Sequence, residues 1–191
     1  MSIVNQIKKI IEHEYKRPNS KYGYDPFNFH IKEVVRISKK LAKKLDADAE
    51  IVELAAWMHD SGSVVHGRED HHITSSKLAK EKLLKLNYPK QRIDHICNCI
   101  LTHRGSQKLN PKTLEAQILV EADTISAFND LTGLFQCAFT YEKLSRQEAK
   151  KSVLNKLNNK WEQLKFAESK KMVIPKYRAI KLLLNNESKL I

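Results

Sequence analysis

The sequence predicts an all-α fold, a compact bundle of helices that ends in a basic helical extension. Apolar residues recur at helical spacing along nearly the whole chain of 191 residues. Only five Gly and five Pro are present, which is few for a turn-rich β protein, whereas the helix-favouring Ala, Leu, Lys and Glu are abundant. We therefore expect a single domain over residues 1–191, with its core motifs over about 24–140 and the helices of 141–191 packed on it.

The first helices follow from the apolar pattern and from chain-breaking residues. Helices are expected over residues 3–16, from His30 to about residue 45, and over 49–58, where Asp48 is a candidate N-cap. The third of these is apolar on most of its sides and therefore belongs in the centre of the domain. Residues 61–70 contain two glycines and predict a loop.

The later helices are marked by capping residues and prolines. The expected starts are Asp70 for residues 71–86, Pro89 for a helix to His103, Asn110 and Pro111 for a helix towards Leu131, a capping box of Ser145 and Glu148 for a long amphipathic helix, and Pro175 for a last short helix.

Composition limits the partners and the compartment. The net charge is +12, and Lys and Arg outnumber Asp and Glu by 13 to 5 in residues 142–191. A basic surface favours anionic partners such as nucleotides or nucleic acid, although solvated helix faces also explain a lysine-rich tail. Three Cys do not make a disulfide framework, and no run approaches the roughly 20 apolar residues that cross a bilayer. We expect a cytoplasmic protein without a membrane partner.

A histidine and an aspartate end the most apolar helix. His59 and Asp60 follow the run LAAWM. A carboxylate is unfavourable there, because the helix dipole places negative partial charge at that end and burial of an unpaired carboxylate costs several kcal/mol. A divalent cation removes both difficulties. Adjacent helical residues point about 100° apart, so both can reach one ion only where the helix ends, as Ser61 and Gly62 allow.

Two further polar residues lie on apolar helices. His30 opens the second helix, and Asp123 interrupts an apolar stretch of a later one. Together with His59 and Asp60 they make two imidazoles and two carboxylates, a set that suits a divalent Mn, Fe, Co, Ni or Mg ion. The set contains no thiolate, which argues against a structural zinc site.

These four residues resemble the H…HD…D signature of the HD-domain metal-dependent phosphohydrolases, in particular small stand-alone bacterial HD hydrolases. The surrounding phrases are similar to those of the family over residues 24–140: HIKEVVRISKKLA, ELAAWMHDSG, DHHITSSKLAKEKL, ICNCILTHRG and VEADTISAF. The sequence departs from the family at Thr124 and Ser126, where relatives often have Arg and Asp, so no substrate contact is expected from these two positions.

The resemblance implies an HD-domain helical bundle with one divalent ion per chain, bound by His30, His59, Asp60 and Asp123. Asp60 would also act in catalysis by orienting a metal-activated water. The implied substrate is a nucleotide or a related small phosphate ester. The resemblance does not select between phosphatase, pyrophosphohydrolase and phosphodiesterase activity.

The histidines that follow leave the number of ions open. Binuclear relatives place extra ligands on the two helices after the HD motif, and His71 or its neighbour His72, together with His103, match those places approximately. The same residues could instead donate to a substrate phosphate. Arg104 and Arg36 are candidates for neutralising the phosphoryl group, with a solvated surface charge as the plainer interpretation.

Other functions fit the same residues. One is a di-iron HD-fold oxygenase, which needs the additional histidines as ligands. Others are a non-catalytic module that binds nucleotide or nucleic acid through the basic tail, and a sensor that binds a nucleotide without turning it over. A separate metal site of His95, Cys99 and His103, which share a helix face at spacing four, has little support.

Overall fold

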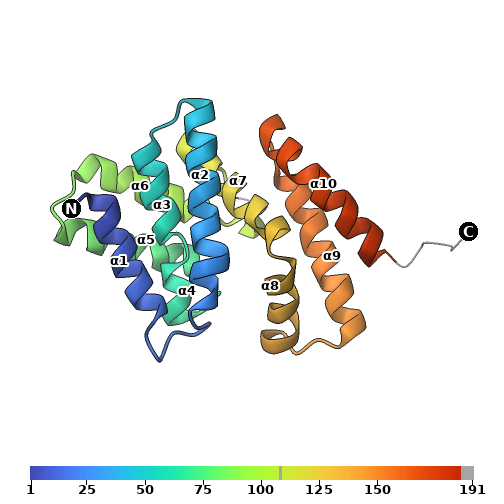
Figure 1. Ribbon diagram of the computed structural model, residues 1–191. Coiled ribbons are helices and arrows are strands. Elements are labelled where there is room, and N and C mark those ends of the chain that lie inside the picture. Colours follow the sequence, from blue (N-terminus) through green and yellow to red (C-terminus); the bar gives the residue numbers. More distant parts are fainter. Residues whose placement is uncertain (108, 186–191) are drawn as a thin grey trace, which may run out of the picture. The chain divides into compact units, whose positions relative to one another are not determined.

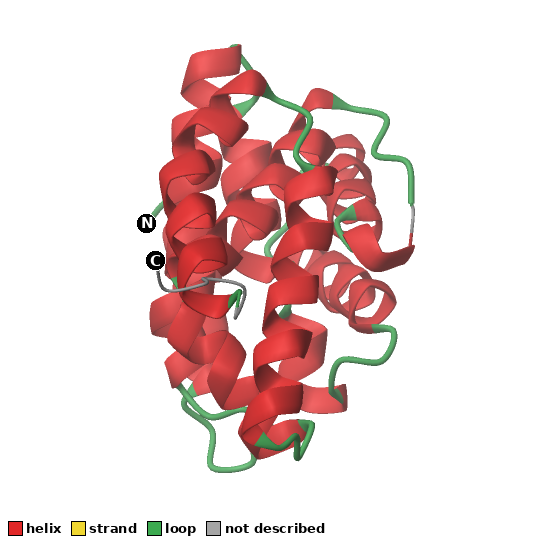
Figure 2. Cartoon of the chain, turned by 90° about the vertical axis from the view of Figure 1, so that its right-hand side faces the viewer, coloured by secondary structure: helices red, strands yellow, loops and turns green. Residues whose placement is uncertain are grey.

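The computed structural model describes residues 1–107 and 109–185, and every regular element in that part of the chain is a helix (Figure 2). This confirms the all-α prediction. Residues 1–123 form one compact unit, and the chain from Thr124 onward forms a second. The packing of the C-terminal helices on the core as one domain stays a prediction. Within the described residues, no helix is both long and apolar enough to cross a membrane.

The first unit contains most of the helices (Figure 1). Its elements are α1 (Ile3–Tyr15), the π-helical turn η1 (Phe27–Ile31), α2 (Lys32–Leu45), α3 (Ala49–Met58), α4 (Ser61–His66), α5 (His71–Lys85), α6 (Lys90–Thr102), the 3₁₀ turn η2 (Gly105–Gln107) and the first part of α7 (Leu114–Asn129).

The second unit begins at Thr124, within α7. It then contains α8 (Leu131–Gln136), the π-helical turn η3 (Cys137–Tyr141), α9 (Arg146–Gln163) and α10 (Ala167–Leu184). The rings of Trp161 on α9 and Tyr177 on α10 stack with centroids 4.8 Å apart. A capping box of Ser145 and Glu148 starts α9, as predicted.

The helix α3 is the centre of the first unit, as its composition predicts. It contacts α1, α2, α5 and α6, and α1 and α2 flank it in Figure 1. Most of its side chains are buried, and full burial of a Val, Leu, Ile or Met side chain contributes about 1.5–3 kcal/mol. The buried end of this helix leads directly into His59, whose side chain is 0% exposed.

Of the predicted starts of α3, α5 and α6, the first is confirmed and the other two differ in the structure. Asp48 caps α3 as expected, since its carboxylate accepts the N–H groups of Glu50 and Ile51, both at 3.1 Å. Asp70 precedes α5 but makes no side-chain cap bond, because its backbone is left-handed, with φ 48°. Pro89 is the N-cap of α6, one residue before the first turn.

The prediction of a loop over residues 61–70 is wrong for Ser61–His66, which form α4. Six residues are too few for a helical period to stand out in the sequence. The helix is held by tertiary contacts: the N–H of Gly62 donates to Ser75 Oγ at 2.9 Å. A Cβ at Gly62 would lie 2.6 Å from the Ser75 nitrogen, so only glycine permits this approach of α4 to α5.

Two other helix boundaries differ from prediction. Pro175 lies inside α10 rather than at the start of a short helix. A proline removes one backbone hydrogen bond, but here the helix continues through it. The helix α7 begins at Leu114 and ends at Asn129, and the Thr113 hydroxyl accepts the Ala116 N–H at 3.2 Å. This polar contact makes Thr113, rather than Asn110, the residue that caps the first turn.

Candidate metal centre

Six candidate ligands are contributed by separate elements of the first unit. They lie on η1, at the junction of α3 and α4, at the start of α5, after the end of α6, and within α7: His30, His59, Asp60, His71, His103 and Asp123. Apart from the adjacent His59 and Asp60, these residues are more than ten positions apart in sequence. The fold, rather than local spacing, therefore brings the residues together.

The π-helical turn η1 holds His30 at the site. Phe27 in this turn is fully buried, and its ring lies 5.8 Å from that of Trp57 and 5.7 Å from that of Tyr15. Ile31, the last residue of the turn, is also buried. The two apolar anchors leave His30 between them, partly exposed. Single π-helical turns occur frequently at functional sites.

His30, His59 and Asp60 form the first triad. The Nε2 atoms of the two histidines are 3.2 Å apart. Asp60 Oδ2 lies 3.4 Å from His30 Nε2 and 3.7 Å from His59 Nε2. Two ligands of one ion, each about 2.1 Å from it, are separated by about 3 Å when they subtend a right angle. These side chains therefore fit a divalent cation.

Asp60, His71 and His103 form the second triad on the other carboxylate oxygen. Asp60 Oδ1 lies 3.2 Å from His71 Nε2 and 3.7 Å from His103 Nε2. The two histidine Nε2 atoms are 3.2 Å apart. Asp60 is thus common to both groups of potential ligands.

Backbone carbonyls orient three of the histidines. His59 Nδ1 bonds the Ala56 carbonyl at 2.8 Å, and His71 Nδ1 bonds the Arg68 carbonyl at 2.8 Å. His103 Nδ1 bonds the Ile100 carbonyl at 2.6 Å. A carbonyl oxygen only accepts, so each of these Nδ1 atoms carries a proton, and Nε2 is the atom through which each neutral ring would bind a cation. Such outer bonds typically fix the tautomer of metal-binding histidines.

Burial and neighbouring charges set the protonation states of His59 and Asp60. Burial lowers the pKa of His59 to about 4, against the opposing effect of Asp60, so His59 is neutral at pH 7. Burial alone would raise the pKa of Asp60, but attraction to the charged form of His59 at acid pH and hydrogen bonds from His103 and His30 hold that pKa well below its usual value. Metal ligands must be neutral imidazoles and ionised carboxylates, and these two groups meet that requirement.

The pKa values of His71 and His103 are shifted in opposite directions. Burial lowers the pKa of His71, while Asp60 partly opposes this. Burial also acts to lower the pKa of His103, but its hydrogen bond with Asp60 and the charges of Asp60 and Asp123 raise it overall. The negative charge of Asp60 therefore raises the pKa of both histidines against the effect of burial.

Asp123 lies beside the first triad without joining it fully. Its Oδ1 is 3.5 Å from His30 Nε2. Its charge also reaches His59 and His103, whose pKa values it raises against the lowering effect of burial. The structure thus brings all four residues of the predicted quartet to one region, with Asp123 at its edge.

The other predicted site residues occupy different settings. His72 is buried, and its Nδ1 has no hydrogen-bond partner among the residues that the structure describes. It belongs to neither triad. Arg104 is near enough for its charge to lower the pKa of His72, after burial and the charge of His71. Arg36 forms two bonds with the carboxylate of Glu33, at 2.7 and 2.6 Å.

The separate cluster of His95, Cys99 and His103 does not assemble into a site. His95 Nε2 lies 3.2 Å from Glu115 Oε2, whereas His103 faces Asp60. Burial raises the pKa of the Cys99 thiol to about 12, so it does not supply a thiolate. Thr124 and Ser126, where the sequence departs from the family, are both buried.

The sequence did not reveal the three carbonyl acceptors or the sharing of Asp60. The acceptors Ala56, Arg68 and Ile100 each stand three residues before the histidine that they orient. That spacing is a usable signal at a helix terminus, where a side chain can fold back onto the preceding turn. The sharing of Asp60 depends on packing between α4, α5 and α6, which no local pattern encodes.

Comparisons with known proteins agree with the observed fold. The HD domain family model matches residues 29–127. A predicted HD superfamily hydrolase from an uncultured Thermotogales bacterium has a TM-score of 0.63 at 17% identity, over 94% of this chain and 88% of that one. Bacillus subtilis YpgQ, in complex with ADP, has a TM-score of 0.73 at 18% identity, over 95% of this chain and 90% of that one. At these identities the likeness establishes the fold.

A curated relative is similar over part of its length. The tRNA (cytidine(56)-2'-O)-methyltransferase of Picrophilus torridus is 24% identical over an alignment of 134 residues that covers 63% of this chain and 37% of that protein. This chain therefore spans well under half of that relative.

Proposed function

The chain belongs to the HD domain family, and we propose that it is a divalent-metal-dependent phosphohydrolase that acts on a nucleotide or a related small phosphate ester. The observation that carries the proposal is the position of Asp60, whose two oxygens face two pairs of histidine Nε2 atoms. The imidazoles of His59 and His71, whose pKa values burial lowers, and the ionised carboxylate of Asp60 suit a divalent cation.

His30, His59 and Asp60 would hold a first ion, with Asp123 beside them. His71, His103 and the second oxygen of Asp60 would hold another. When bound, such ions lower the pKa of a coordinated water and stabilise charge on a phosphoryl group. The sequence alone favoured one ion per chain, and the second triad now supports two. Mn, Co, Ni, Fe and Mg all remain compatible with nitrogen and carboxylate ligands.

The chain's own residues would supply orientation and positive charge. Asp60 is ionised, so it can accept a hydrogen bond from a water molecule and direct that water towards phosphorus. Arg104 contributes a permanent positive charge near His71 and His72. A guanidinium so placed can bind phosphate oxygens and stabilise their charge during transfer.

A nucleotide is the substrate class that the comparisons favour. The structure of B. subtilis YpgQ contains ADP, and the two chains share a fold. The net charge of +12 also favours an anionic substrate over a neutral one. A phosphatase, a pyrophosphohydrolase and a phosphodiesterase would each use the same centre.

The test is a panel of nucleoside mono-, di- and triphosphates and cyclic dinucleotides, each with Mn, Co, Ni or Mg. Phosphate and pyrophosphate are measured separately, since their ratio identifies the bond that is cleaved. We expect turnover with at least one pairing and its loss in Asp60→Asn. Absence of turnover in the metal-loaded protein with every pairing would refute the nucleotide assignment, and tight binding without turnover would instead identify a sensor.

A second candidate function is di-iron oxygenase chemistry. The specific observation in its favour is the second histidine pair, because two ions are required. Metal analysis of protein isolated without added metal discriminates between the two. Two irons per chain together with oxygen consumption would favour the oxygenase, whereas non-iron ions and phosphate release would favour the hydrolase.

A further inference from the structure

The second unit contains a hollow that the proposed reaction does not use. Its volume is about 490 Å³, and it lies between α8, η3, the start of α9 and the end of α10. Four apolar side chains line it: Phe135, Phe139, Leu183 and Leu184. Arg146 and Lys150 line it as well. We call this region the apolar–basic hollow.

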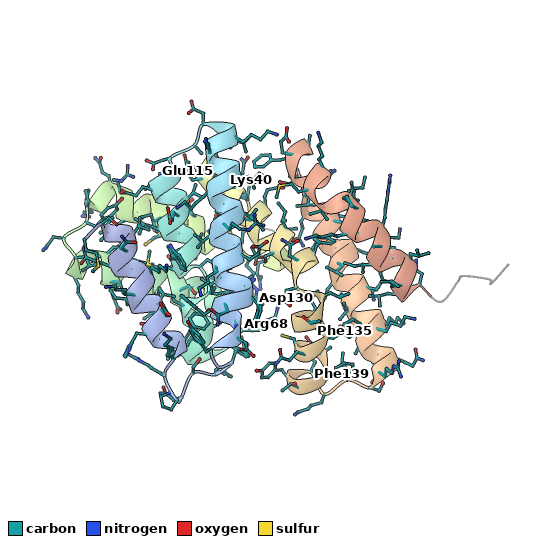
Figure 3. The ribbon with its side chains drawn as sticks, viewed as in Figure 1. Lys40, Arg68, Glu115, Asp130, Phe135 and Phe139 are labelled. Atoms are coloured by element: carbon teal, nitrogen blue, oxygen red, sulfur yellow. The ribbon has the colours of Figure 1, made fainter. Side chains whose placement is uncertain are left out.

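Much of the apolar surface here is exposed to water. The rings of Phe135 and Phe139, both labelled in Figure 3, stack with centroids 5.9 Å apart. Phe139 is nevertheless 44% exposed. Leu182 and Leu183, in the last turn of α10, are 72% and 71% exposed. A cluster of exposed large apolar side chains is characteristic of a surface that contacts another apolar phase.

The charge around the hollow is positive. Arg146 and Lys150 are one helical turn apart on α9, and Lys181 directly precedes the exposed leucines on α10. The wider region repeats this bias, because Lys and Arg outnumber Asp and Glu by 13 to 5 in residues 142–191. The occupant of such a surface is therefore anionic as well as apolar.

We propose that the apolar–basic hollow docks the protein on the surface of an anionic lipid bilayer. Leu183 and Phe139 from the hollow, with the neighbouring exposed Leu182, would enter the boundary between headgroups and acyl chains. Arg146 and Lys150 would contact headgroup phosphates. Interfacial helices bind membranes by this combination of buried apolar area and attraction to acidic lipids. The contact is peripheral, so it agrees with the absence of a spanning helix among the described residues.

A bilayer fits these side chains better than a nucleic acid does. Nucleic-acid binding is dominated by phosphate contacts and base stacking, and it would leave the two exposed leucines in water. The expectation of no membrane partner was based on the lack of a spanning segment alone. Only the fold places residues of α8, η3, α9 and α10 around one hollow.

Sedimentation of the full chain with vesicles tests the proposal. Vesicles of phosphatidylcholine alone are compared with vesicles that also contain phosphatidylglycerol. We expect binding to the acidic vesicles and little binding to the neutral ones. Removal of two charges in Arg146→Gln/Lys150→Gln should weaken binding about 30-fold, from about 1 kcal/mol per basic residue at the membrane surface. Leu182→Ser/Leu183→Ser should weaken it by at least about tenfold.

Matched variants in the first unit serve as controls. Lys40 and Lys43 are exposed on α2, and Leu84 is 50% exposed on α5. Lys40→Gln/Lys43→Gln and Leu84→Ser should bind acidic vesicles as the wild type does. In all four variants the substituted side chains are exposed or lie at the rim of the hollow. Circular dichroism checks that the variants are folded.

Three results would overturn the proposal. The first is no binding to acidic vesicles. The second is equal binding to neutral and acidic vesicles. The third is wild-type vesicle binding by the leucine variant while single-stranded RNA competes with the vesicles, which would identify a nucleic-acid surface instead.

Discussion

Asp60 presents its two carboxylate oxygens to two different pairs of histidines. Oδ2 faces His30 and His59, and Oδ1 faces His71 and His103. Asp60 would therefore contribute to the binding of an ion at either triad, and its loss should affect both. The sequence predicted Asp60 as a ligand from its position after an apolar helix, but it could not predict this sharing.

Neighbouring histidines provide a matched pair of variants. His71→Gln should weaken binding of the second Mn²⁺ at least about tenfold, because its Nε2 faces Asp60 Oδ1 at 3.2 Å. His72→Gln should leave Mn²⁺ binding unchanged, since His72 belongs to neither triad. Isothermal titration with Mn²⁺ measures both. Equal weakening by the two substitutions would contradict the assignment of His71.

The sequence could not show which of His71 and His72 faces Asp60. Adjacent residues on a helix point about 100° apart, so a shift of one residue in the helix start exchanges their directions. The bond from His71 Nδ1 to the Arg68 carbonyl settles the direction, and it depends on the irregular backbone before α5.

Arg104 is expected to bind the substrate phosphate. Arg104→Gln should raise KM about tenfold or more for the substrate found in the panel, because a hydrogen bond to a charged group contributes about 1.5–3 kcal/mol. Lys40→Gln, an exposed change on α2, should leave KM unchanged. Steady-state kinetics at fixed Mn²⁺ measure the effect. A KM for Arg104→Gln equal to that of the wild type would remove Arg104 from the site.

At the scale of elements, α4 is the piece that sequence periodicity could not detect. Most long amphipathic helices were predictable, because their apolar faces repeat over three or more turns. The six residues of α4 are helical because they pack on α5, and the glycine at position 62 permits that packing. The same contact holds α4 against α5, the helix that begins with His71.

Gly62→Ala tests that contact. The added Cβ would lie 2.2 Å from Thr74 Oγ1 and 2.6 Å from the Ser75 nitrogen. Overpacking of this kind costs about 1–3 kcal/mol in the free energy of unfolding. Val65→Ala changes a 54% exposed side chain on the same helix and should cost far less. Urea denaturation compares the two, and similar stabilities would show that α4 does not need its glycine.

Asp48 should make the stability of α3 depend on acid pH. Burial alone would raise its pKa, but hydrogen bonds from Arg92 and from the N–H groups of Ile51 and Glu50 lower it below its ordinary value of 3.8. Because the folded pKa is the lower one, the stabilisation is present above pH 3.8 and is lost as pH falls through the folded value.

Asp48→Ala should therefore cost about 1 kcal/mol at pH 7, as loss of an N-cap usually does. Its difference from the wild type should shrink below about pH 4. Asp48→Asn keeps a capping oxygen and should lose less at pH 7. Thermal unfolding at several pH values measures these differences. A wild-type advantage that grew on acidification would refute the sign of this pKa shift.

At the scale of the whole chain, the sequence was sufficient for the fold class and the family. The fold class follows from helical periodicity. The family follows from motif residues such as His59 and Asp60, whose residue types are those that bind metal ions. The division into units at Asp123 was not predicted, because α7 runs continuously across it and no linker composition marks it. The apolar–basic hollow could not be predicted from the sequence either, since its residues come from four separate elements.

The number of tightly bound Mn²⁺ ions in the wild type and in Asp60→Ala tests the central claim most directly. Equilibrium dialysis of the two metal-free proteins measures it, with circular dichroism to check the fold of the variant. We predict two ions per wild-type chain and the loss of both in Asp60→Ala, because the carboxylate belongs to both triads. Retention of either ion at wild-type affinity in Asp60→Ala would contradict a shared metal centre.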